Sequence, residues 1–305
     1  GGLPVFLGVL ITSLIFLPLN KIILGILTAG LLTTLVGLWD DRRDLSPYLR
    51  FAANILTAAI IVGVGVGIPF ITNPFDHVIL LDTWRVSFTF FGNHSILVWA
   101  DMFAILWIVW TMNIVGWSSG VDGQMPGFVA IAATMLGVLA LRFSAHDISQ
   151  TTVATLAFIT AGAFAGFLPW NFYPQKIMPG YGGKTLAGLL LATIAILSGG
   201  KVGSALIILA VPMLDAGYIL IKRILAKKSP FRAARSHLHH HLLSLGWGKR
   251  RIALFYWGVS AILGLLTLSL ESQQKFYAFV VLGVVVGGII MWLNFALHQE
   301  KITNS

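Results

Sequence analysis

Residues 22–70 read IILGILTAGLLTTLVGLWDDRRDLSPYLRFAANILTAAIIVGVGVGIPF, so two long apolar runs enclose a short charged cluster, WDDRRDLSP, at 39–47. Each run is long enough to cross a bilayer as a helix. The chain has only 11 Asp and Glu among 305 residues, and Asp40, Asp41 and Asp44 fall within five positions here. Carboxylates at a membrane surface are costly unless a cation or a function requires them. The stretch therefore predicts a membrane protein with a metal, phosphate or proton site at this surface.

The composition agrees with this class over the whole chain. Hydrophobic residues make up 57% and charged residues 10%, whereas soluble domains carry about 25% charged residues. We expect a single all-α polytopic membrane domain over residues 1–305 with about ten transmembrane helices. Nine remain an alternative, because one segment is short and Lys21 barely separates the first two. The expected spans are 5–19, 22–38, 51–70, 97–116, 125–141, 151–168, 185–198, 202–221, 252–270 and 276–297.

The distribution of Lys and Arg predicts the orientation. With residue 1 in the cytoplasm, the inward loops are 39–50, 117–124, 171–184 and 222–251, followed by the tail from 298. All but five of the 20 Lys and Arg residues lie in these segments or their flanks. This asymmetry satisfies the positive-inside rule and predicts a plasma-membrane protein whose functional loops face the cytoplasm. An anionic inner leaflet explains the net charge of +9, so no nucleic-acid partner is expected.

The external segment 71–96 is the longest on the opposite side. Its apolar residues at 78–81 and its alternation at 86–90 predict that these two stretches pair as a small β-hairpin on the outer face. The chain has no cysteine, so no disulfide is expected.

The first inward loop carries the aspartate cluster. In a helix, Asp40 and Asp44 share a face with Asp41 beside them. Carboxylates this close raise the pKa of at least one of them unless cations intervene. We interpret the cluster as a Mg²⁺ or general-base site. The alternative is a solvated helix end paired with Arg42 and Arg43.

The second inward loop runs from Asn113 to Gly127. Its only carboxylate, Asp122, lies between Gly120 and Gly123, which allow backbone to approach a ligand closely. A Gly-rich turn with a helix-capping Asp is an equally good explanation.

The third inward loop, from Pro169 to Thr185, places Gly-rich backbone just before a predicted helix. Lys176 and Lys184 lie nearby, and this combination suits an anion at a helix N-terminus. A plain connecting loop remains open.

The fourth inward loop, 222–251, is the longest and most basic, with RSHLHHH at 235–241. A helix here would place His237, His240 and His241 on one face. Such histidines bind phosphate or metal, or carry protons. The alternative is a solvated or merely metal-binding histidine tract.

Together the four loops resemble those of the polyprenyl-phosphate N-acetylhexosamine-1-phosphate transferases, integral membrane enzymes of cell-wall and surface-polysaccharide synthesis. The likeness extends over nearly the whole chain. It rests on Asp40-Asp41-x-x-Asp44, the loop 113–127, the loop from Asn171 to Gly188, and Ser229-Pro230-Phe231 followed by His237-x-His239-His240. Gly1 to Gly8 is similar to the segment after the family's first membrane helix, so the chain is expected to lack that helix.

The chain departs from the family pattern at several positions. Tyr181 and Lys184 replace the Asp and the Ser of the family's Gly-Asp-x-Gly-Ser motif. In the second loop, Gly116 stands for an Asn and Ser119 for an Asp, and Ala234 stands where an Asp often precedes the histidines. Losing carboxylates weakens a Mg²⁺ site, because Mg²⁺ is bound by hard oxygen ligands. Lys184 would partly replace the metal as a fixed charge.

The resemblance implies that a polyprenyl phosphate attacks the β-phosphate of a UDP-sugar, giving polyprenyl-diphospho-sugar and UMP. The implied cofactor is weakly bound Mg²⁺, and a homodimer is a candidate assembly. The residues should line one cytosolic cleft, with the following roles: catalytic, Asp40, Asp41 and Asp44; nucleotide-sugar binding, Asn113, Asp122, Asn171 and Lys184; phosphate binding, Arg235, His237, His239 and His240; metal binding, Asp40, Asp41 and Asp122.

Two other functions remain open. A non-catalytic family member would bind lipid phosphate or nucleotide-sugar without turnover, and the departures at Ser119 and Tyr181 favour it. A transporter would need charges or broken helices in mid-membrane, whereas nearly all charge here lies in loops. Asp215, after Pro212, is the main exception, and it lies near the cytosolic end of its predicted span.

Overall fold

The computed structural model describes residues 1–73, 75, 78–89, 93–143, 149–198, 201–227 and 237–303. In these residues the elements are α1 (Gly2–Phe16), α2 (Lys21–Arg43), α3 (Pro47–Gly63), β1 (Phe70–Thr72), β2 (Val78–Leu80), β3 (Arg85–Thr89), β4 (Asn93–Leu97), α4 (Val98–Trp117), α5 (Gln124–Phe143), α6 (Ser149–Asn171), α7 (Gly180–Leu197), α8 (Lys201–Ile208), α9 (Ala210–Leu225), α10 (Leu238–Ser244), α11 (Lys249–Ser269) and α12 (Ser272–Thr303).

The apolar helices confirm the all-α polytopic membrane class. Among the described residues, seven helices are long and apolar enough to cross a membrane: α2, α4, α5, α6, α7, α11 and α12. The pair α8 and α9 would make an eighth span, while α1 and α3 are apolar but shorter. By this measure seven or eight of the ten expected spans have full membrane length.

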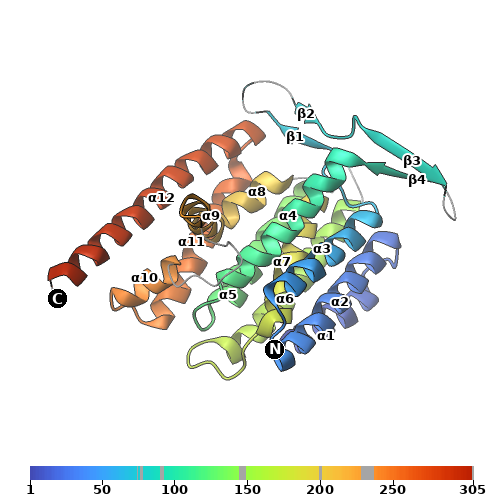
Figure 1. Cartoon of the computed structure of the whole chain (residues 1–305). Helices are drawn as coiled ribbons and strands as arrows, with labels where there is room; N and C mark the ends of the chain where they lie inside the picture. The colour runs from blue at the N-terminus through green and yellow to red at the C-terminus, as the bar shows by residue number, and fades with distance from the viewer. Residues whose placement is uncertain are drawn as a thin grey trace.

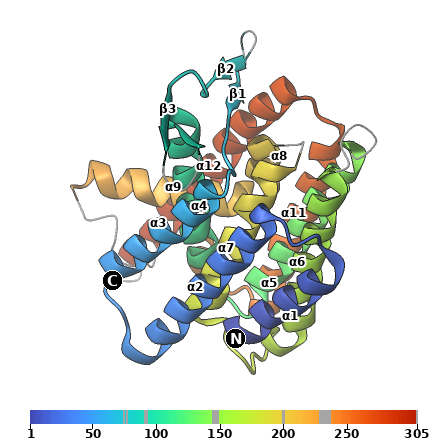
Figure 2. The same cartoon turned by 90° about the vertical axis from the view of Figure 1, so that its right-hand side faces the viewer.

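The segment expected to span the membrane at 202–221 is not one continuous helix. The chain bends by 87° between α8 and α9, and Figure 2 shows α9 extending sideways from α8. A continuous helix would need an N–H at position 212 to donate to the carbonyl of Ile208, and Pro212 has none. Pro212 instead lies in the first turn of α9, where a missing N–H costs little.

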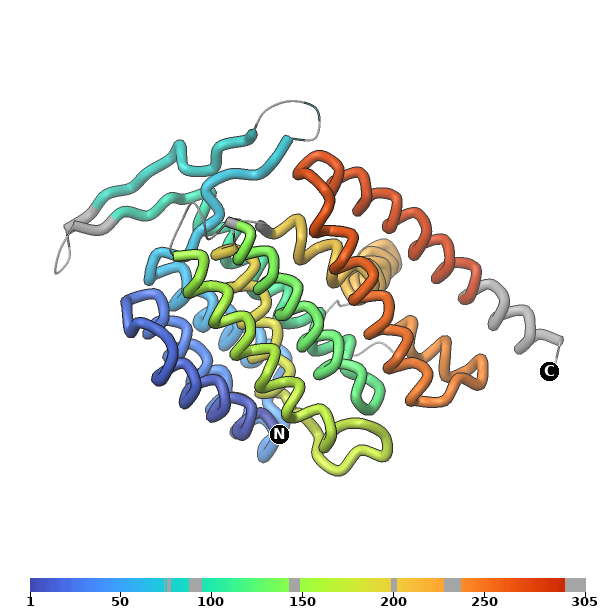
Figure 3. The backbone as a smooth tube through the Cα atoms, turned by 180° about the vertical axis from the view of Figure 1, so that it is seen from behind, coloured from blue at the N-terminus to red at the C-terminus, as the bar shows by residue number. Residues whose placement is uncertain are grey.

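The functional loops gather at one end of the bundle. Figure 1 shows the strands at one end, and the N-terminus, the α6–α7 connection and α10 toward the other. Seen from behind in Figure 3, α1 and α2 lie on one side of the bundle and α11 and α12 on the other. Helix α7 packs against α2, α4 and α5. Its first turn follows the α6–α7 connection and so lies at this end of the bundle.

A close approach between two glycines fixes α7 against α2. A Cβ added to Gly37 would lie 2.1 Å from the Cα of Gly182. Only residues without a Cβ allow two backbones to come this near. The contact brings the end of α2, with Asp40 and Asp41, beside the start of α7.

The outer strands form two ribbons, so the expected pairing of 78–81 with 86–90 is wrong. β1 pairs antiparallel with β2 through Phe70↔Leu80, and β3 pairs with β4 through Arg85↔Leu97. One further backbone hydrogen bond extends each ribbon: Leu81 N–H donates to the carbonyl of Pro69, and Val98 N–H to that of Trp84. Each predicted strand thus takes a partner from outside the predicted pair.

Candidate active site

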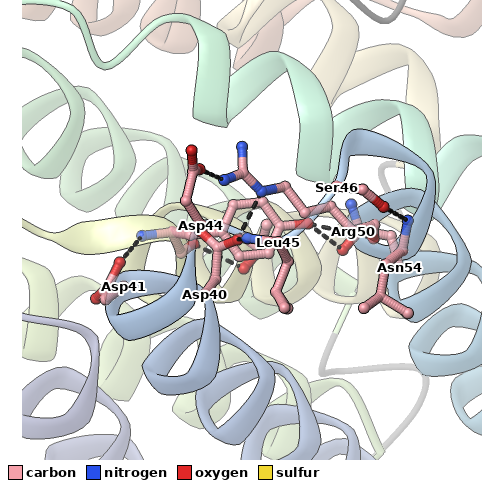
Figure 4. A network of polar contacts seen from close by, with 10 residues as sticks. Asp40, Asp41, Asp44, Leu45, Ser46, Arg50 and Asn54 are labelled. Carbon is pink, nitrogen blue, oxygen red and sulfur yellow. Dashed lines mark hydrogen bonds and ion pairs between the residues drawn. The ribbon is translucent and has the colours of Figure 1, made fainter.

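The aspartate cluster is organised by Arg50, in the first turns of α3 (Figure 4). Asp40, near the end of α2, is buried. Its Oδ1 accepts a hydrogen bond from Arg50 Nε at 2.6 Å and another from Leu45 N at 3.1 Å. Asp44 is 95% exposed at its side chain and pairs with the other arm of Arg50. The cation expected among the carboxylates is therefore Arg50, which the sequence pattern did not identify.

Asp41 is turned toward α7 instead. Its Oδ1 accepts a hydrogen bond from Tyr181 N at 3.0 Å. The preceding Gly180 has φ +67, and a Cβ there would lie 2.3 Å from Asp41 Oδ2. A carboxylate at this place caps the helix and is favoured by the partial positive charge of its N-terminus. Asp41 thus joins the first and third loops.

Tyr181 and Arg50 form one wall. The Tyr181 hydroxyl lies 3.1 Å from Asn54 Oδ1 and 3.3 Å from the carbonyl of Arg50, and it donates to one of them. The Arg50 guanidinium lies 5.4 Å from the centre of the Tyr181 ring. The ring is consequently fixed to α3 on the same side as Asp40.

The second and third loops are tied together by Asn171 and Asp122. The buried Asn171 accepts from Gly123 N at 3.0 Å and donates to the carbonyl of Ile177 at 2.9 Å. Asp122 lies 3.1 Å from Lys249 Nζ, at the start of α11. Asn171 therefore holds the loops in place, and Lys249 is a second cation that the sequence reasoning missed.

The histidines of the fourth loop differ in their surroundings. His237 precedes α10 in extended conformation, and its Nδ1 lies 2.9 Å from Asp215 Oδ2. The His239 ring stacks on that of His237, with centroids 5.5 Å apart, and fills the space where a Cβ of Gly120 would lie. Burial, followed by the charges of His240 and His237, lowers the pKa of His239 to about 3, so this ring is neutral at physiological pH.

Two adjoining cavities open among these residues. The helix-lined cavity, about 610 Å³, lies between α3, α4, α7, α9 and α10 and has mostly apolar walls, including Phe51, Met112 and Ile219. The loop-lined cavity, about 620 Å³, is more polar. Both are bounded by Arg50, Ser119, Gly120, Tyr181 and Lys184. Lys184, one turn into α7, thus stands where the two cavities meet.

The predicted site residues divide between the cavities, whereas one common cleft was expected. Asp40, Asp41, Asp122 and Asn171 line the loop-lined cavity. Asn113, His237, His239 and His240 line the helix-lined cavity, and Lys184 lines both. Asp44 is not among the lining residues of either. Arg235 and Ala234 lie outside the described residues. The face expected to carry His241 is formed by His237, His239 and His240 instead, because α10 begins only at Leu238.

The carboxylates in place do not fit a Mg²⁺ ion. Asp40 is paired with Arg50, Asp41 caps α7, and Asp122 is paired with Lys249. In the described part of the chain, no three His, Asp or Glu side chains are grouped so that they could hold a metal. The stretch 228–236, outside that part, contains no Asp or Glu in its sequence. The Lys184 side chain occupies the place where the cavities meet.

Comparison with known proteins yields one family and several relatives. The model described as glycosyl transferase family 4 matches residues 23–199, which include most of α2 and all of α7. A decaprenyl-phosphate N-acetylglucosaminephosphotransferase of Mycobacterium tuberculosis is 28% identical over 95% of this chain and 76% of its own. An undecaprenyl-phosphate alpha-N-acetylglucosaminyl 1-phosphate transferase of Thermotoga maritima is 28% identical over 98% and 84%. A phospho-N-acetylmuramoyl-pentapeptide-transferase of Staphylococcus epidermidis is 26% identical over 88% and 83%.

Proposed function

Because the chain belongs to glycosyl transferase family 4, we propose that it transfers N-acetylhexosamine-1-phosphate from a UDP-sugar to polyprenyl phosphate, for cell-wall or surface-polysaccharide synthesis. The matched family and the named relatives confirm the resemblance inferred from the four loops. The observation that carries the proposal is the pair of cavities, one apolar and one polar, that meet at Lys184. By the charge asymmetry of the loops, this end of the bundle faces the cytoplasm.

We assign the helix-lined cavity to the polyprenyl phosphate. Its apolar walls come from helices that cross or border the membrane, so an isoprenoid chain entering between them leaves one apolar medium for another. Arg223, His237 and His240 line the same cavity. These are groups that donate to phosphate oxygens, or do so when protonated. The expected phosphate-binding role of the histidines thus becomes a role at the lipid end.

We assign the loop-lined cavity to the UDP-sugar. Its walls offer carboxylate, amide and ammonium groups from Asp122, Gln175 and Lys249, which suit hydroxyls, a base edge and phosphates. Asn171 contributes indirectly, since both ends of its side-chain amide already bind backbone.

The reaction takes place where the cavities meet. An oxygen of the lipid phosphate bonds to the β-phosphorus, and the bond from that phosphorus to the bridging oxygen breaks. The bridging oxygen leaves with the electron pair as part of UMP. If the lipid phosphate carries a proton, Asp41 accepts it. The Lys184 ammonium, held on the buried helix α7, neutralises charge that develops on the diphosphate.

The remaining aspartates support this arrangement. Asp40 orients Arg50 at the shared wall, through the contact at 2.6 Å. Asp40, Asp41 and Asp122 are engaged by Arg50, Tyr181 N and Lys249, so they do not form a ligand set for Mg²⁺. We expect any Mg²⁺ dependence to be weak, with the ion brought by the diphosphate itself.

The test is transfer from UDP-GlcNAc labelled with ³²P at the β-phosphate to polyprenyl phosphate in detergent. We expect the label in a lipid product, together with one UMP for each lipid formed. The non-catalytic alternative, which the departures from the family pattern at Ser119 and Tyr181 favour, predicts binding of both substrates without labelled lipid. Label recovered as free sugar phosphate would refute the transfer.

A further inference from the structure

A buried carboxylate outside the predicted site holds the histidine segment. Asp215 on α9 is 1% exposed. Both of its oxygens are used: Oδ2 lies 2.9 Å from His237 Nδ1, and Oδ1 accepts a hydrogen bond from Leu238 N at 2.8 Å. A buried carboxylate is costly unless it is fully hydrogen-bonded. The two contacts satisfy it and attach the start of α10 to α9.

The attachment matters because α9 is a wall of the helix-lined cavity. Ala216 and Ile219, on the turns beside Asp215, line that cavity together with His237. Along the chain, Asp215 and His237 are separated by 22 residues, including the stretch 228–236 outside the described residues. Asp215 therefore fixes the position of His237 relative to the cavity.

The contact also determines which nitrogen of His237 faces a ligand. An ionised carboxylate only accepts hydrogen bonds, so Nδ1 must carry the proton that points to Asp215. The other nitrogen, Nε2, is left as an acceptor in the neutral ring and as a donor in the charged ring. His239 differs, because its ring is packed against Gly120.

We infer that Asp215 is a positioning residue of the lipid-phosphate end: it fixes the tautomer and orientation of His237 so that Nε2 is available to the phosphate in the helix-lined cavity. The inference rests on the proposed function for the identity of the ligand. The contact between Asp215 and His237 does not depend on it. Asp215 acts through His237 and has no contact with substrate of its own.

The first experiment reads the tautomer directly, without activity. Protein labelled with ¹⁵N in the histidine rings is examined by NMR, and His237 is assigned as the signal lost in His237→Gln. We expect Nδ1–H in the wild type. In Asp215→Asn the amide oxygen keeps the bond from Leu238 N, while its NH₂ faces Nδ1, so the ring should change to Nε2–H. An Nε2–H ring in the wild type would overturn the inference.

The second experiment separates positioning from stability. In Asp215→Asn we expect kcat/KM for polyprenyl phosphate to fall about 10- to 100-fold, as when carboxylates that orient other histidines are removed. The KM for UDP-GlcNAc should stay within about twofold, since His237 does not line the loop-lined cavity. In a His237→Gln background, Asp215→Asn should add less than about twofold, because the two changes remove one coupled contact.

Asp101→Asn is the matched control. Asp101 also accepts a backbone hydrogen bond, from Leu97 N at 3.0 Å, but it lies at the end of α4 next to the strands. The substitution Asp101→Asn should therefore leave both KM values unchanged. Two results would show that the role of Asp215 is only structural. In the first, Asp215→Asn lowers the melting temperature and shifts both KM values equally. In the second, it lowers kcat/KM as much in the His237→Gln background as in the wild type. If the wild type transfers nothing, the proposed function fails. This inference is then still tested by two measurements: the tautomer of His237, and the effect of Asp215→Asn on the affinity for polyprenyl phosphate.

Discussion

The two cavities share a wall but differ in the balance of polar and apolar surface. The helix-lined cavity is bounded mainly by the sides of helices and offers mostly apolar groups, together with His237, His240 and Arg223. The loop-lined cavity is bounded by connections and helix ends and offers carboxylates, amides and Lys249. The difference shows how one membrane domain can bind a lipid and a nucleotide. Each substrate binds a cavity whose surface matches its polarity, and only their phosphates come together at Lys184.

The largest expected effect comes from the loop-lined side of the wall. Asp41→Asn keeps an oxygen to accept from Tyr181 N but removes the charge and the proton acceptor, so turnover should fall about 1,000-fold. Asp44→Asn is the control, because Asp44 is exposed and outside the lining of both cavities, and it should stay within a few-fold. If Asp41→Asn retained most of the activity, the residue would be a helix cap only.

A change at the meeting point should affect both substrates. Lys184→Ala removes the fixed ammonium and should reduce kcat about 100-fold, the order seen when one preorganised donor is lost. Tyr181→Phe keeps the packed ring and loses one hydroxyl contact, so its cost should be under about tenfold. Steady-state kinetics with each substrate varied would measure both. A larger loss in Tyr181→Phe than in Lys184→Ala would place the critical group on the tyrosine.

The contact between the second and fourth loops can be broken without touching a polar group. A Cβ on Gly120 would lie 2.0 Å from His239 Nε2, and the buried ring cannot move away freely. Gly120→Ala should therefore destabilise the protein by about 2 kcal/mol, measured by thermal unfolding in detergent. Gly116→Ala is the matched control, since its Cβ would be 3.9 Å from the nearest neighbour. Equal melting temperatures for the two variants would contradict the packing of His239 in the second loop.

A smaller effect is expected from pH, through His239. Its pKa of about 3 lies below the ordinary value of 6.5, so the unfolded chain binds a proton that the folded chain excludes. The contribution of His239 to the free energy of unfolding is therefore fully present above pH 6.5 and is lost as the pH falls toward 3. Between pH 6.5 and 5.5 the loss should be at most about 1 kcal/mol. His239→Gln should show a shallower fall in melting temperature over this range, and an unchanged slope would contradict the buried neutral ring.

The sequence predicted what depends on local pattern. The fold class followed from apolar runs, and the four loops stood out because Asp41, Asp122, Asn171 and His237 are rare residue types between those runs. The functional residues that the sequence did not reveal depend on tertiary contacts. Lys249 is 127 residues from Asp122, and Asp215 is 22 residues from His237, so no periodicity records either pair.

Other misses have local causes that the sequence did contain. Arg50 lies ten residues after Asp40, within the predicted inward loop 39–50, but the charged cluster was defined only as far as Pro47. Pro212 marked the break between α8 and α9, although the apolar run around it was read as continuous. The division into two cavities could not be predicted, because it depends on Arg50, Tyr181 and Lys184, from two separate helices, coming together between them.

The central claim is that a fixed ammonium stands where the two phosphates meet. The most direct measurement is transfer to polyprenyl phosphate in a titration of Mg²⁺, from a chelator to high millimolar concentrations, for the wild type, Lys184→Ala and the double variant Tyr181→Asp with Ser119→Asp. We predict that the wild type depends weakly on Mg²⁺ or needs it only at high concentration, and that the double variant, with two carboxylates added, depends on it more steeply. Lys184→Ala should lose activity throughout. A wild type that is inactive without Mg²⁺ and saturated at sub-millimolar levels would contradict the claim.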